Sequence, residues 1–131
     1  WLDNNHIISF CYTDQFGEAY TVFVDKTNEF KVLSNNLPKC DGHPSVDFSG
    51  KWMITDTYPQ FDRMSRLYLF NLHTNEVICL GRFYQPLKYS GSYRIDLHPK
   101  WNLKGDKIYF ESGHNGLRNL YALDVSRITK S

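Results

Sequence analysis

A unit of about 50 residues that begins with His-Pro constrains this chain more than any other feature. The segments "GHPSVDFSGKWMITD" (42–56) and "DLHPKWNLKGDKIYFE" (96–111) place His-Pro, a glycine and an acidic residue at the same spacing, 55 positions apart. An upstream copy is shorter: "HIISF" (6–10) and "TVFVD" (21–25) match "WMITD" and "YLFN" (68–71). Such a period is typical of architectures in which similar units pack side by side.

Each unit is predicted to consist of four short strands. Apolar and aromatic runs alternate with turn residues, and "TNE" recurs between the third and fourth runs, at 27–29 and 74–76. Aromatic residues make up 16% of the chain, which favours strands over a helical bundle. A helix is expected only as a short turn near 126–130. The pattern therefore predicts an all-β fold built from antiparallel propeller blades.

The repeat divides the chain into unequal portions. We predict a partial β-propeller of about two and a half four-stranded antiparallel blades, within one domain fragment over residues 1–131 and with blade portions at roughly 1–37, 38–95 and 96–131. Propellers usually close with four to eight blades, so we expect a larger propeller. Open blade edges would then favour self-association. An antiparallel β-sandwich and a self-contained small β domain are the alternatives, although sandwich strands have no reason to repeat a histidine at a fixed phase.

Composition limits the classes of partner. The 15 Lys and Arg residues and 14 Asp and Glu residues are scattered, which argues against nucleic acid or an anionic membrane. No apolar run approaches the roughly 20 residues of a membrane span. The first residues lack signal-peptide features, which leaves cytoplasm and periplasm both open. Three cysteines without metal-type spacing are predicted to be buried free thiols.

Two histidines occupy equivalent positions in neighbouring units. Because the innermost strands of adjacent blades converge on the propeller channel, His43 and His98 are expected to approach each other. Imidazole ligates divalent metals and titrates near neutrality, so the pair suggests a metal site or an acid–base pair. Asp96 would join them, since residues i and i+2 of an extended strand share a face. The alternative is that each histidine caps its blade by hydrogen bonding to a neighbouring loop.

Two long connections are candidates for ligand contact. The segments "YPQFD" (58–62) and "RFYQPLKYSGSYR" (82–94) are rich in Tyr, Arg and Gln. Aromatic rings pack on sugar CH faces while Arg and Gln bind hydroxyls or carboxylates. Ordinary loops packed down by their aromatics are the alternative. The predicted substrate-binding residues are Arg82, Tyr84, Gln85 and Arg94. No Ser-His-Asp, phosphate-loop or zinc-finger pattern is present, so no catalytic residue is assigned.

The repeat resembles a known family. "GHPSVDFSGKWMITDTYP", "LYLFNLHTNEVICLGRFY" and "DLHPKWNLKGDKIYFESGHNGLRNLYALDV" resemble TolB-type propeller repeats. Within these, they are most similar to the oligogalacturonate lyase branch and the related Bacteroidetes-type propeller proteins. The resemblance is densest over 40–125, and the "GHPS" and "DLHP" pair is its most specific part.

The resemblance implies a function. Oligogalacturonate lyases are seven-bladed propellers that hold manganese through channel histidines and perform β-elimination on acidic sugars. By motif, His43 and His98 resemble metal ligands, and Asp96 stands where the family has the first histidine of His-x-His. The family's catalytic histidine would precede Trp1 and is not in this sequence. The resemblance thus implies a carbohydrate-active propeller that uses Mn or another divalent cation on an acidic oligosaccharide or polysaccharide. The alternatives are a non-catalytic TolB-like scaffold and a polysaccharide-biosynthesis protein of the kind described as a glycosyltransferase.

Overall fold

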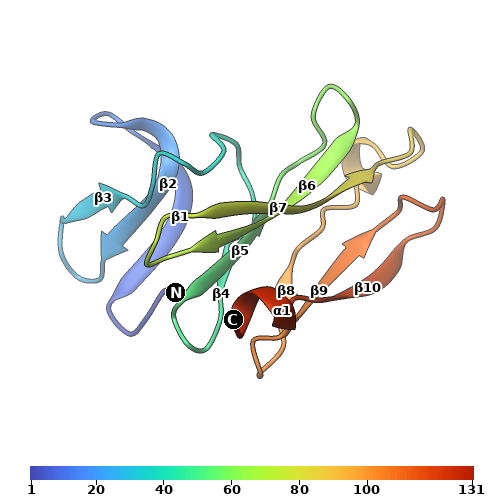
Figure 1. The fold of residues 1–131 in the computed structure, drawn as a ribbon. Coiled ribbons are helices and arrows are strands. Elements are labelled where there is room, and N and C mark those ends of the chain that lie inside the picture. The colour runs from blue at the N-terminus through green and yellow to red at the C-terminus, as the bar shows by residue number, and fades with distance from the viewer.

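The computed structural model describes all of residues 1–131 and contains three antiparallel sheets that lie side by side (Figure 1). The first sheet holds β1 (His6–Thr13), β2 (Gly17–Val24) and β3 (Phe30–Val32). The second holds β4 (Ser45–Val46), β5 (Trp52–Asp56), β6 (Met64–Asn71) and β7 (Val77–Tyr84). The third holds β8 (Lys100–Trp101), β9 (Lys107–Ser112) and β10 (Asn119–Asp124). The prediction of an all-β partial propeller is confirmed.

The repeated turn has the same construction in the second and third sheets. Gly50 and Gly105 both adopt left-handed backbone, with φ of 70° and 65°, which glycine enters without steric cost. Asp47 accepts hydrogen bonds from the backbone N–H of the first residue of β5 and from that of the residue before it. Asn102 accepts in the same way at the start of β9. These side chains fix the turn between the first two strands of each unit, which explains why the glycines recur in register.

Each sheet packs face to face on the next. Strand β5 is buried at every position because both of its faces are covered. Met53 points into the cluster shared with the first sheet, and Ile54 into the cluster shared with the third. The core between the second and third sheets consists of Trp52, Ile54, Leu67, Leu69, Leu97, Ile108, Phe110 and Val125. A continuous apolar run such as "WMIT" is therefore what a central blade requires.

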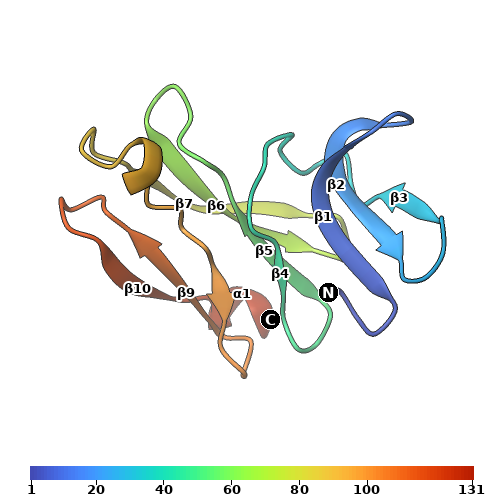
Figure 2. The same ribbon diagram turned by 180° about the vertical axis from the view of Figure 1, so that it is seen from behind.

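The inner strands of neighbouring blades meet. Strands β4 and β8 are edge strands of their sheets and contact each other, and both are visible from behind in Figure 2. The indole Nε1–H of Trp101 donates to the carbonyl oxygen of Ser45 at 3.1 Å, which ties the two strands together. Each strand begins directly after its His-Pro, as predicted. This junction is where the predicted histidines lie.

Helical structure is limited to the 3-10 turn η1 (Gly91–Tyr93) and α1 (Ser126–Thr129), which confirms the predicted short helix near 126–130. Neither is long and apolar enough to cross a membrane. All three cysteines are free thiols. Cys79 is exposed on the outer strand β7, and Cys11 and Cys40 are only partly buried, so the prediction of buried thiols is wrong.

Candidate metal centre between two blades

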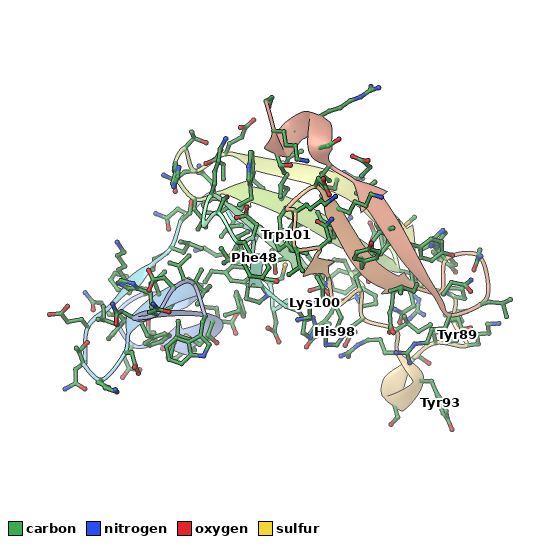
Figure 3. All side chains as sticks on the ribbon, turned by 90° about the horizontal axis from the view of Figure 1, so that it is seen from below. Phe48, Tyr89, Tyr93, His98, Lys100 and Trp101 are labelled. Carbon is green, nitrogen blue, oxygen red and sulfur yellow. The ribbon has the colours of Figure 1, made fainter.

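Two imidazole rings from adjacent blades lie against each other. The ring centroids of His43 and His98 are 3.7 Å apart, with an angle of 34° between the planes. One coordinating atom from each histidine and one from Asp96 all lie within 4.8 Å of one another. The structure thus brings together the three residues that the sequence suggested as metal ligands. Figure 3 shows His98 close to Lys100 and Trp101, the two residues of β8.

A close backbone approach positions His43. A Cβ atom on Gly42 would lie 2.0 Å from the carbonyl oxygen of Asp56 and 2.7 Å from the hydroxyl of Tyr20. Only glycine leaves room for this segment to press against the first and second blades. The residue that follows, His43, is therefore held beside the end of β5.

His98 reaches the site through an unusual backbone conformation. Its φ is 45°, in the left-handed region that non-glycine residues rarely adopt, although histidine does so more often than most. No strand covers 96–98, so the expectation that Asp96 and His98 share a face of an extended strand is wrong. The two side chains approach because the chain turns at His98 before Pro99.

The carboxylate of Asp56 links both histidine segments. Its side chain is fully buried and accepts hydrogen bonds from the backbone N–H of His43 at 2.7 Å and of His98 at 3.0 Å. It also accepts from the Nδ1 of His43 at 3.0 Å. An ionised carboxylate only accepts, so Nδ1 carries a hydrogen, and in the neutral ring the Nε2 of His43 then keeps its lone pair. A carboxylate that orients an imidazole in this way is the usual partner of a metal-binding histidine.

A second carboxylate is already paired with a cation. Asp96 receives two hydrogen bonds from Arg94, from Nε at 2.6 Å and from Nη2 at 3.1 Å. The guanidinium lies 4.1 Å from the ring centroid of Tyr58. Hydrogen bonding to Asp96 raises the pKa of Arg94. Partial burial raises the pKa of the Tyr58 phenol, and the charges of Asp41 and Asp96 add to this.

The donor set fits a divalent cation. Two imidazoles and one carboxylate suit first-row transition metals, Mn²⁺ and Zn²⁺ included. Ligand atoms about 2.0–2.2 Å from a metal lie at most about 4.4 Å from one another. The three ligand atoms lie within 4.8 Å of one another, slightly more than that limit, so binding one cation through all three requires small movements of these side chains. Three ligands leave positions for water or for an oxygen of a ligand.

The other predicted substrate-binding residues lie elsewhere. Arg82 and Tyr84 belong to β7, the edge of the second sheet opposite to β4, so β5 and β6 separate them from the histidines. Gln85 is buried, and its Nε2 donates to the carbonyl oxygen of Ile95 at 2.6 Å, which ties down the connection between blades. Among the four, only Arg94 lies at the site.

Two features of the site were not predicted from the sequence: the bridge from Asp56 to both histidine segments and the Gly42 contact. Tyr58 lies in the 58–62 connection, which the sequence suggested for ligand contact. The acidic residue that closes the second strand of each unit was a signal for the Asp56 bridge. Its counterpart Glu111 behaves differently, because it is partly exposed and pairs with Arg118. The close contact of Gly42 with Asp56 and Tyr20 depends on how the neighbouring blade packs, so no local sequence pattern indicates it.

No family model and no curated protein matches the sequence. Among solved structures, TolB from Acinetobacter baumannii is similar over 82% of this chain, with 21% identity and a TM-score of 0.61. A TolB candidate from Agrobacterium tumefaciens is similar over 97% of the chain, with 18% identity and a TM-score of 0.63. This chain spans 24% and 44% of those two proteins. These likenesses establish the fold of this chain as part of a β-propeller, similar to the propellers of those two proteins.

Proposed function

We propose that this chain is the cation-binding part of a propeller that binds an acidic carbohydrate. In this proposal a divalent cation such as Mn²⁺ is held by His43, Asp96 and His98 at the junction of two blades. The observation that carries it is the convergence of these three side chains, from two blades, to within 4.8 Å. The orientation of His43 by a buried carboxylate supports it, because that arrangement leaves Nε2 available.

The bound cation would supply positive charge to an oxygen of the ligand. Arg94 and Tyr58 lie next to the site, and together they offer a guanidinium fork and an aromatic face. A guanidinium binds a carboxylate in two hydrogen bonds, and an aromatic ring packs on the CH face of a sugar. These groups therefore suit a uronate, which agrees with the resemblance to oligogalacturonate lyases. The chain offers no assigned base, so we propose binding by these residues and no proton transfer.

A non-catalytic scaffold of the TolB type is the second candidate, and one observation favours it. The polar groups of the site already have protein partners, since Asp56 binds both histidine segments and Asp96 binds Arg94. Such contacts would brace two blades without any ligand. The two functions differ in whether the cluster binds a cation at one-to-one stoichiometry.

Calorimetric titration of the chain with MnCl₂ tests the proposal. We expect one cation per chain, with binding abolished in His43→Ala and in His98→Gly, since glycine preserves the left-handed backbone at that position. His73→Ala is the matched control, because His73 lies in the β6–β7 connection, outside the cluster, and should bind as the unmodified chain does. The absence of one-to-one binding, or its persistence in both site variants, would favour the scaffold.

A further inference from the structure

The carboxylate of Asp96 can bind either of two positive charges, the guanidinium of Arg94 or a cation held by the two histidines. Both of its oxygens are engaged by Arg94, Oδ1 by Nε and Oδ2 by Nη2. The same carboxylate contributes one of the three coordinating atoms of the cluster. A cation coordinated there would have to share or displace the guanidinium.

The guanidinium of Arg94 has a second contact besides Asp96, the ring of Tyr58. Its Cζ atom lies over the Tyr58 ring, and Tyr58 in turn packs edge-on against His43, with centroids 5.8 Å apart. Arg94 therefore forms part of the wall of the site. An arginine that leaves Asp96 can stay stacked on the tyrosine, because a guanidinium binds an aromatic face.

We propose that Arg94 competes with the cation for Asp96 and, when the cation displaces it, becomes the binding group for an anionic ligand. This inference rests on the proposed cation site. In the absence of cation the ion pair closes the site, and cation binding frees the guanidinium fork beside the metal. Cation and anion then bind with positive coupling, and by thermodynamic linkage each raises the affinity for the other by the same factor.

Arg94 opposes cation binding through its positive charge as well as through the space it occupies. Arginine stays protonated at all ordinary pH, so its charge always opposes a second cation at the same carboxylate. The Arg94 side chain is 39% exposed, and solvent screens part of this repulsion. Removal of the guanidinium should therefore tighten cation binding, whereas removal of an ordinary supporting residue would weaken it.

The test compares Mn²⁺ affinities by calorimetry for the unmodified chain, Arg94→Met, Arg94→Lys and the control Arg82→Met on β7. We expect Arg94→Met to bind Mn²⁺ about two- to fivefold more tightly, the range for loss of a partly exposed ion pair. Arg94→Lys keeps the charge without the fork and should lie in between. Arg82→Met should match the unmodified chain. Thermal melting of each variant verifies that it is folded.

A second experiment measures the affinity of the chain for an anionic sugar, with and without Mn²⁺. D-glucuronate should bind the unmodified chain more tightly when Mn²⁺ is present, the effect should disappear in Arg94→Met, and neutral D-glucose should show no such effect. If the unmodified chain and Arg94→Met both bind no Mn²⁺, the cation site and this inference fail together. If Mn²⁺ binds and His43→Ala abolishes it, but Arg94→Met binds with equal or lower affinity, the cation site stands and the competition is wrong.

Discussion

The backbone N–H of His98 donates to the Oδ2 of Asp56 at 3.0 Å, across the boundary between the second and third blades. The other carboxylate oxygen accepts the backbone N–H and ring Nδ1 of His43. One buried side chain thus sets the position of both histidines. The packing of the two blades and the geometry of the candidate site therefore depend on the same residue.

Asp56→Asn should impair stability and cation binding together. The amide replaces one acceptor oxygen with an NH₂ group, which leaves at least one N–H donor unpaired in a buried position. We expect a loss of about 2–4 kcal/mol in the free energy of unfolding, measured by urea denaturation. Cation affinity should fall about 10- to 100-fold, because His43 loses the partner that orients it.

Glu111→Gln is the control for that experiment, since Glu111 occupies the equivalent position of the next unit. Its side chain is 36% exposed and pairs only with Arg118, so the free energy of unfolding should change by less than about 1 kcal/mol. Equal effects of the two substitutions would show that Asp56 has no special role.

Gly42→Ala should push the backbone that carries His43 away from the end of β5. The added methyl group would meet the backbone oxygen of Asp56, which cannot rotate away. We expect a destabilisation of about 2–3 kcal/mol, together with weaker cation binding because His43 is displaced. Gly17→Ala is the comparison: it has left-handed backbone, with φ of 70°, and open space around it, so it should cost only about 1–2 kcal/mol. It should also leave cation affinity unchanged.

Alkaline pH should weaken the contact between the first two blades. The Tyr20 hydroxyl is buried and hydrogen-bonded to the Thr55 hydroxyl at 2.7 Å, and burial raises the pKa of Tyr20 above its ordinary 10.0. The folded state thus holds a proton that the unfolded chain releases above that value. Stability from this group is present below pH 10.0 and declines as pH rises through the folded pKa.

Tyr20→Phe should lower stability at pH 7 by about 1 kcal/mol and reduce the alkaline loss. Urea denaturation between pH 7 and pH 11 would measure both effects. Tyr12→Phe provides the control, since Tyr12 is 68% exposed and should change neither quantity. An unaltered alkaline slope in Tyr20→Phe would contradict this account.

Acid should loosen the C-terminal helix. The ammonium of Lys130 lies 2.7 Å from Asp106, and hydrogen bonding to Lys130 and then Asn102 lowers the pKa of that carboxyl below its ordinary 3.8. The ionised form is favoured by folding, so its contribution is present above pH 3.8 and is lost as pH falls through the lower, folded pKa. Asp106→Asn should reduce the urea midpoint at pH 7, with the difference fading at low pH.

Lys130→Met should reproduce that pattern, because it removes the other partner of the pair. A deficit of Asp106→Asn that persists unchanged in acid would mean that the ionisation of Asp106 is not what anchors the helix.

The equal spacing of His-Pro and glycine in the two units was enough to predict much of the fold. His-Pro and glycine at a common offset located the starts of β4 and β8 and their shared turn, because those features depend on local backbone preferences. The same phase predicted that His43 and His98 would meet. The left-handed backbone of His98 could not be predicted, since a residue before proline ordinarily favours extended backbone.

The rest of the site depends on contacts between blades. Asp56 and Glu111 are equivalent in sequence, yet one is buried against two histidine segments and the other pairs at the surface with Arg118. Composition suggested Arg82 and Tyr84 as ligand contacts, although their strand lies at the far edge of its sheet. Which face of a blade meets a neighbour is decided by packing, and a single sequence does not record it.

The most direct test of the central proposal is a crystal structure of the chain grown with MnCl₂, with anomalous diffraction data collected near the manganese edge. We predict one anomalous peak among the Nε2 of His43, a ring nitrogen of His98 and a carboxylate oxygen of Asp96, with Arg94 moved away from Asp96. An ordered site without a peak, or a peak only at other residues, would contradict the proposal and leave the histidines as braces between two blades.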